Sequence, residues 1–188
     1  MDAMISRPRY DRLSLGLGRT HLLIIQGSEL PLGCLASSVT LDDFDEIWKV
    51  VSCSSVLPEP GSAEKQFRSA NHLTIALCHR LSSETMGLRV YVVGEESFVW
   101  DINAQCRRFG LGNDEIHVFA PYHGARRVRC AHCRAYTTNC QNTIVTCDGC
   151  GATLLVRDHF SRFWNAYQGF QIDSEEPGVV PESVAFRS

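Results

Sequence analysis

The chain has 188 residues, of which 44% are hydrophobic and 21% are charged, and its formal net charge is −3 at neutral pH. This composition predicts a globular protein, the acidic balance argues against a general nucleic-acid binder, and no apolar stretch of about 18 residues is available to span a membrane. Residues 1–19 are expected to form a loose arm without the apolar segment of a signal peptide. We therefore expect a cytoplasmic protein whose nine cysteines are reduced thiols or metal ligands rather than disulfides.

Strands are predicted where short apolar runs are bounded by glycine or polar residues. These runs are residues 21–27, 72–80, 88–94 and 115–120. Residues 57–65, which contain two prolines and a glycine, predict a loop or the entrance to a helix.

Helices are predicted over residues 41–52 and 95–112, each of which begins with acidic residues and carries an apolar stripe. The stripes are Phe44, Ile47, Trp48 and Val51 in the first segment, and Phe98, Ile102, Cys106 and Phe109 in the second. Gly110 is placed to end the second helix. Strands that alternate with helices need crossover connections, so residues 20–122 are predicted to form an α/β domain, with a parallel sheet and helices on both of its faces.

Two C-x-x-C pairs mark the next module, predicted to cover residues 123–157. The pairs are Cys130 with Cys133 and Cys147 with Cys150, and thirteen residues separate them. Four thiolates at this spacing are typical of a tetrahedral metal site, and glycines around the last cysteine favour the tight turn that it needs. We predict a small zinc ribbon whose ion replaces the missing hydrophobic core.

The identity of the metal is left open by the residues alone. Zinc is expected, but the same four thiolates could hold iron in a rubredoxin-like site, whereas a catalytic zinc is not expected because no coordination position stays open. Cys140, between the pairs, is interpreted as a spare buried residue. Residues 158–188 are predicted to be a tail, first aromatic and then acidic, whose aromatic part packs on a protein surface.

The α/β domain carries two motifs of a known domain. Val93-Gly94-Glu95 precedes the predicted helix and Glu115–Phe119 follows it, while residues 21–37 form a strand and a turn. These segments resemble the nucleotide-binding domain of ferredoxin-reductase-type flavoenzymes, which implies a fold that binds NAD(P). The glycine-rich pyrophosphate loop is absent, and Glu29 places an anion there. We therefore expect a degenerate domain of this type, without the flavin-binding barrel that precedes it in the enzymes.

The cysteine module is followed by a dense set of motif residues: Gly151, His159-Phe160-Ser161-Arg162, Ala166-Tyr167, Gly169, Asp173, Glu175 and Pro177-Gly178. With the four cysteines, they resemble the C-terminal domain of the DmmA-like subunit of bacterial dimethylamine monooxygenase. The resemblance implies a small zinc-binding accessory subunit of a multicomponent oxidative N-demethylase, which mediates assembly or electron-path docking between larger reductase and haem-containing subunits. It also implies that flavin and haem lie in those partners, and no catalytic residue is predicted here.

Three alternatives remain from the residues themselves. They are a rubredoxin-like iron carrier, a truncated reductase, and a zinc-ribbon adaptor that binds protein or nucleic acid. Metal content and salt-dependent binding to DNA or RNA are the observations that separate them.

Overall fold

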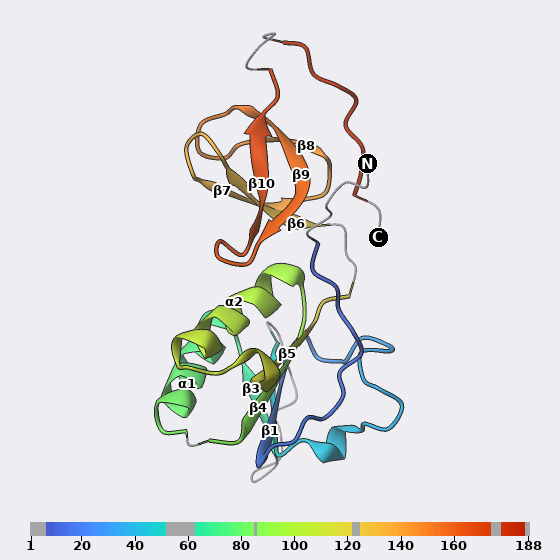
Figure 1. The fold of residues 1–188 in the computed structure, drawn as a ribbon, viewed down its shortest axis with the longest axis vertical. Helices are drawn as coiled ribbons and strands as arrows, with labels where there is room; N and C mark the ends of the chain where they lie inside the picture. Colours follow the sequence, from blue (N-terminus) through green and yellow to red (C-terminus); the bar gives the residue numbers. More distant parts are fainter. Residues whose placement is uncertain (1–6, 52–62, 85, 122–124, 174–177, 187–188) are drawn as a thin grey trace. The chain divides into compact units, whose positions relative to one another are not determined.

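The computed structural model describes residues 7–51, 63–84, 86–121, 125–173 and 178–186. The chain divides into two compact units, and each contains a five-stranded sheet (Figure 1). The α/β unit is Tyr10–Pro121, and the β unit is Met1–Arg9 together with Tyr122–Ser188. Among the described residues, no helix is both long and apolar enough to cross a bilayer.

The sheet of the α/β unit is parallel throughout, as predicted, and its strand order is β3-β2-β1-β4-β5. The strands are β1 Thr20–Gln26, β2 Glu46–Val50, β3 Glu64–Phe67, β4 Leu88–Val93 and β5 Ile116–Phe119. This is the usual order of doubly wound nucleotide-binding sheets, in which the connections reverse direction between β1 and β4. Both central strands are continuous buried apolar runs, which is why they were recognisable from the sequence.

Helix α2, Glu96–Arg108, confirms the prediction for residues 95–112. Gly110 ends it with a φ of +91°, and two hydrogen bonds close the turn. The Gly110 N–H donates to the Arg107 carbonyl at 3.0 Å, and the Leu111 N–H donates to the Cys106 carbonyl at 3.2 Å. This pair of bonds satisfies carbonyls that would otherwise be left free at a helix C-terminus.

The strand predicted at residues 72–80 is wrong, because this segment lies within helix α1, Ala70–Ser82. Leu73, Leu77 and Leu81 recur every four residues and are buried on one face. The Ser69 side chain accepts the His72 N–H at 3.3 Å and caps the helix. A nine-residue apolar run fits a strand and a buried helix equally well, so its period alone could not decide.

The helix predicted at residues 41–52 is also wrong. A short 3₁₀ turn, Leu41–Asp43, leads into strand β2, where Trp48 and Val50 alternate as buried residues. β2 is hydrogen-bonded to β1 on one side and to β3 on the other. This pairing outweighs the helix-like spacing of the apolar residues in the segment. Of the segment predicted as a loop or helix entrance, residues 57–62 lie outside the described residues, and Glu64 and Lys65 begin β3.

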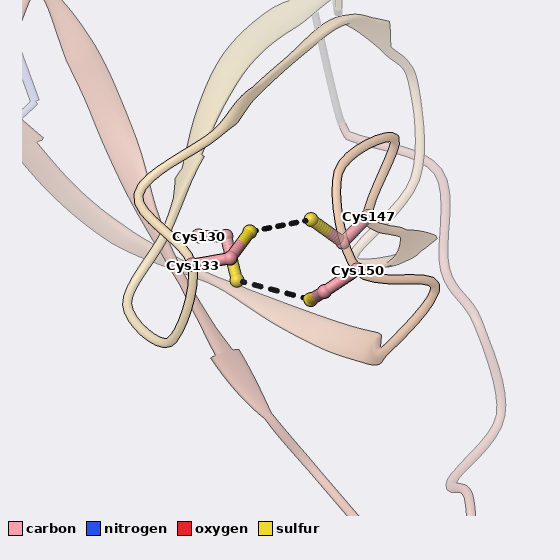
Figure 2. Close-up of side chains that lie close together, drawn as sticks. All are labelled: Cys130, Cys133, Cys147 and Cys150. Carbon is pink, nitrogen blue, oxygen red and sulfur yellow. Dashed lines mark hydrogen bonds between the residues drawn. The ribbon is translucent and has the colours of Figure 1, made fainter.

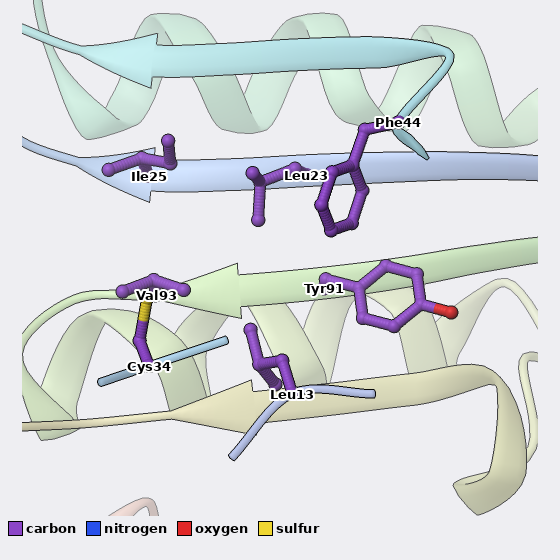
Figure 3. Packing of buried hydrophobic residues seen from close by; sticks show 7 residues of the cluster. All are labelled: Leu13, Leu23, Ile25, Cys34, Phe44, Tyr91 and Val93. Atoms are coloured by element: carbon purple, nitrogen blue, oxygen red, sulfur yellow. The ribbon is translucent and has the colours of Figure 1, made fainter. Parts of the chain in front are cut away.

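Among the described residues, irregular chain rather than α-helix covers the second face of this sheet. α1 and α2 contact each other and lie on one face, behind the strands in Figure 3. On the opposite face, Leu13, Cys34 and Phe44 come from segments without α-helix and pack on the strands. Their partners in the sheet are Leu23, Ile25, Tyr91 and Val93. The prediction of helices on both faces is therefore wrong for this face.

The β unit contains a second sheet with the order β7-β6-β10-β9-β8. Its strands are β6 Arg126–Cys130, β7 Tyr136–Cys140, β8 Ile144–Thr146, β9 Thr153–Ser161 and β10 Ala166–Gln171. β6 and β10 are parallel, and the other pairs are antiparallel. β9 runs through residues 157 and 158, where the sequence suggested a boundary, and β10 occupies the centre of the sheet.

Candidate metal centre

Both C-x-x-C pairs lie in tight turns that close hairpins of the β unit. Cys130 ends β6 before the turn to β7, and Cys147 follows β8 before the turn to β9. The two hairpins stand at opposite ends of the strand order, yet the four sulfurs all lie within 4.8 Å of one another (Figure 2). The sheet therefore curls until its two ends meet at the cysteines.

The two turns have the same backbone hydrogen bonds. In each, the N–H of the first cysteine donates to the carbonyl five residues later, and the N–H four residues later donates back to the carbonyl of that cysteine. The donor and acceptor pairs, all 2.9–3.0 Å apart, are Cys130 with Ala135, Arg134 with Cys130, Cys147 with Ala152, and Gly151 with Cys147. Two independent segments have thus formed one local structure, which presents two sulfurs each.

Glycines at 149 and 151 serve the second turn in different ways. Gly151 has a φ of +72°, the conformation that glycine adopts without strain, and Arg134 holds the equivalent place in the first turn with a φ of +66°. Gly149 instead allows close packing, because a Cβ there would lie 2.5 Å from the Ala135 Cβ and 3.1 Å from the Cys133 sulfur. The packing role could not be predicted from the sequence, since Ala135 belongs to the other hairpin.

The distances between the sulfurs fit a bound metal ion. Cys130 and Cys150 have sulfurs 3.9 Å apart, and the sulfurs of Cys133 and Cys147 are 3.5 Å apart. A tetrahedron of thiolates with bonds of about 2.3 Å places its sulfurs about 3.8 Å apart, whereas a disulfide needs about 2.05 Å. All four predicted ligands are brought together as free thiols in a geometry that suits zinc or iron.

The four thiols cannot all ionise at neutral pH without a cation. Burial raises the pKa of Cys147, but the backbone N–H groups of Cys150 and Gly149 and two neighbouring thiols outweigh it, and the pKa is about 7. The Ala135 backbone lowers the pKa of Cys133, but burial and the three other thiols raise it to about 12. A metal ion that binds here must therefore displace protons.

Each pair contributes one buried and one exposed cysteine. Cys130 and Cys147 are buried, while Cys133 and Cys150 face solvent. Cys140 is buried outside this group, and burial raises the pKa of its thiol to about 11. The interpretation of Cys140 as a spare buried residue is confirmed among the described residues.

The point between β1 and β4, where a dinucleotide would bind, carries a contact within the chain. β1 leads into irregular chain rather than a helix, so no helix N-terminus follows it to receive a pyrophosphate. At the point between β1 and β4, the Gln26 side-chain oxygen accepts the Glu95 N–H at 2.8 Å. A Cβ on Gly94 would meet that glutamine side chain at 2.7 Å. The residues present here do not fit a dinucleotide.

The aromatic residues of β9, β10 and the turn between them are divided between core and surface. Phe160 and Tyr167 are buried and meet edge to face at 5.2 Å, whereas Phe163 and Trp164 are 81% and 41% exposed. Sequence reasoning missed Arg126, whose buried guanidinium lies 3.7 Å from the Phe186 ring and pairs with Asp158 at 2.7 Å. The burial of Arg126 could not be predicted from its local sequence, because its partners are distant along the chain.

Comparison with known proteins accounts for both units. Residues 127–170 match the family described as dimethylamine monooxygenase subunit DmmA-like, C-terminal domain, and residues 54–116 match the corresponding N-terminal domain. The heme-dependent oxidative N-demethylase delta subunit of Ectopseudomonas mendocina (strain ymp) is 38% identical over 164 residues, covering 86% of this chain and 85% of that subunit. The chain belongs to the DmmA-like family.

The family resemblance predicted from the cysteine module is thus confirmed, and it extends to the α/β unit. The C-terminal DmmA-like match begins in β6 and ends in β10, so it contains both cysteine pairs and the exposed aromatic residues. No solved structure matches this DmmA-like chain significantly.

Proposed function

We propose that this DmmA-like chain is a zinc-binding accessory subunit of a multicomponent oxidative N-demethylase, acting in the cytoplasm. In this proposal the larger haem and reductase subunits perform catalysis and this chain mediates their assembly. The observation that supports it best is the 38% identity to the delta subunit of a heme-dependent oxidative N-demethylase, across 85% of that subunit. The identity extends over both units, so it supports a shared role of the whole chain rather than of the metal module alone.

A structural role for the metal follows from its ligands. Bound zinc would supply a redox-inactive cross-link, held by Cys130 and Cys133 on one hairpin and by Cys147 and Cys150 on the other. Four thiolates leave no position open for substrate, so the ion would shape the β unit rather than take part in a reaction.

The α/β unit supports the non-catalytic role. Gln26 occupies the point between β1 and β4, and the chain after β1 forms no helix that could receive a pyrophosphate. We therefore propose that the unit serves as a scaffold, and that oxidation of a nicotinamide cofactor takes place in a partner subunit.

Electron transfer is the second candidate function, and one observation favours it. Cys133 and Cys150 are exposed, so an iron ion at this site would lie close to the surface where electrons could enter or leave. A rubredoxin-like carrier would use the same four ligands.

Metal analysis of the purified chain tests both candidates. We expect one zinc ion per chain, no visible absorption band, and co-purification with the haem subunit when the subunits of the demethylase are expressed together. Cys133→Ser should lose the metal, whereas Cys140→Ala, which changes a buried cysteine outside the group, should keep it. Stoichiometric iron with visible absorption would support the carrier instead, and a chain that never binds haem or reductase subunits would contradict the accessory role.

A further inference from the structure

We propose that the turn between β9 and β10 is the docking surface for an acidic partner subunit, and that the metal centre holds this surface in place. The surface, called here the aromatic turn, comprises residues 162–165 together with Arg129 and Tyr136, which contact Trp164. The inference rests on the proposed function and adds to it the residues that dock, the chemistry of the partner and the dependence on metal.

Two adjacent aromatic side chains are exposed at the aromatic turn. Phe163 is 81% exposed and Trp164 41% exposed, and their rings meet edge to face at 4.6 Å. Aromatic residues and arginine are enriched at protein interfaces, where aromatic side chains bury a large area at a small cost in conformational entropy. Exposed aromatic rings side by side are therefore better explained by a partner than by solvent.

Three contacts within the chain position Trp164 without any partner. The Arg129 guanidinium lies 4.1 Å from the centre of the Trp164 ring. The Tyr136 hydroxyl donates to the Trp164 carbonyl at 3.4 Å, and the Trp164 N–H donates to the Ser161 hydroxyl at 3.3 Å. A surface fixed in advance loses little freedom on binding, which favours affinity.

Arg129 and Tyr136, the two residues whose side chains contact Trp164 from other strands, both adjoin the first cysteine turn. Arg129 directly precedes Cys130, and Tyr136 directly follows Ala135, whose carbonyl closes that turn. Arg129 and Tyr136 also face each other across the β6–β7 pair. An ion that fixes the sulfurs therefore fixes the position of both residues, and loss of the ion should loosen Trp164.

The charge around the aromatic turn identifies the chemistry of the partner. Residues 129–136 and 159–171 contain three arginines and no aspartate or glutamate, although the whole chain carries a net charge of −3. A divalent ion with four thiolates would add about −2, which leaves these two segments with a net charge of about +1. The positive charge of Arg129 lies over the Trp164 ring, within the aromatic turn itself. A basic aromatic surface on an acidic protein suits a partner that offers carboxylates around an apolar socket.

Co-purification of the co-expressed demethylase subunits tests the docking surface. The double variant Phe163→Ser/Trp164→Ala should reduce the recovered partner by at least about tenfold while the zinc content stays unchanged. Leu32→Ser, which alters a fully exposed apolar residue of the α/β unit, is the matched control and should leave recovery unchanged. If wild type and double variant recover partner equally, the docking surface is wrong and the accessory role stands. If even the wild-type chain recovers no partner subunit, both the docking surface and the accessory role are wrong.

Fluorescence of Trp164 tests the dependence on metal without any partner. Subtracting the spectrum of Trp164→Phe isolates Trp164 from Trp48 and Trp100, which belong to the α/β unit. We expect removal of zinc by a chelator to shift this difference spectrum to the red and to lower its anisotropy. An unchanged spectrum after the metal is lost would overturn the link. Quenching by oligo-dT that weakens steeply with salt would instead identify a nucleic-acid partner and overturn the acidic protein surface.

Discussion

At the scale of single residues, the two cysteine turns differ in one place that affects their stability. Gly151 and Arg134 occupy equivalent positions with positive φ, but only glycine adopts this conformation without strain. The spacing of the cysteines was enough to predict that the four sulfurs come together. The strain at Arg134 and the contact between Gly149 and Ala135 could not be predicted, because they depend on how two distant turns meet.

Substitutions at these equivalent positions should have opposite effects. Arg134→Gly should stabilise the β unit by about 1 kcal/mol, and Gly151→Ala should destabilise it by about 1 kcal/mol, since the cost of a side chain at positive φ is removed or added. Thermal unfolding of the zinc-loaded protein measures both. Gly112→Ala, at a φ of −76° with no close neighbour besides the Glu115 side chain at 3.6 Å, controls for the substitution itself. Equal effects at 134 and 151 would contradict the equivalence of the turns.

His117 gives the α/β unit a dependence on pH. Its ring stacks on Tyr91 at 4.9 Å, and its Nε2 has no hydrogen-bond partner among the described residues. Burial lowers the pKa of His117 below its ordinary value of 6.5, and a backbone hydrogen bond at Asp114 offsets this only in part. The folded protein therefore binds the proton less readily than the unfolded chain does, so stability is full above pH 6.5 and is lost as the pH falls below it.

The variant His117→Phe should remove this loss of stability between pH 7 and pH 5 while it keeps the stacking on Tyr91. Denaturant unfolding at several pH values measures how steeply the free energy of unfolding changes with pH, which is the slope compared here. His79→Phe changes an exposed histidine of α1 and should leave the slope as it is in wild type. A slope that survives in His117→Phe would show that another group is responsible.

At the scale of elements, sequence patterns succeeded where local and tertiary preferences agree. α2 has an acidic start, an apolar stripe and a terminal glycine, and β1 and β4 are continuous apolar runs, so each was predicted correctly. Residues 41–52 and 72–80 were assigned the wrong type because their apolar spacing suits either structure. Pairing with β1 decides that the first segment forms strand β2. Packing of three leucines against the sheet decides that the second forms helix α1, and neither interaction can be seen in the local sequence.

Paired alanine substitutions can verify the helical assignment of α1. In a strand, Leu73, Ile75 and Leu77 would share one face, but in the helix Leu77 is buried and Ile75 is 59% exposed. Leu77→Ala should therefore cost about 2–5 kcal/mol of unfolding free energy, and Ile75→Ala less than about 0.5 kcal/mol. Urea unfolding measures both, and comparable losses would argue for a strand.

At the scale of the whole molecule, the two units use different means to stay folded. The α/β unit buries two central strands between helices and irregular chain, whereas the β unit brings the ends of its sheet together at four cysteines. The family and the meeting of the four cysteines could be predicted from the sequence, because they depend on motifs. Strand β10 could not, because it pairs with β6, which lies far from it in the sequence, as well as with β9.

Metal removal should therefore affect only one unit. We expect calorimetry of the zinc-loaded protein to show two transitions, of which a chelator lowers the one that belongs to the β unit by removing the energy of metal binding from its folding. Cys140→Ala should respond to the chelator as wild type does. A chelator that shifts both transitions equally would show that the units unfold together.

The Gln26 side chain gives the start of α2 an acceptor from within the chain, at the place where a bound anion would serve in an enzyme of similar strand order. We therefore expect the α/β unit to fold without a bound dinucleotide. By mass action, a compound that does not bind the native state cannot raise the melting temperature, so millimolar NADH or NADPH should leave the melting curve unmoved. If the melting curve is indeed unmoved, the amount of folded chain in a cell should not depend on the supply of nicotinamide cofactor.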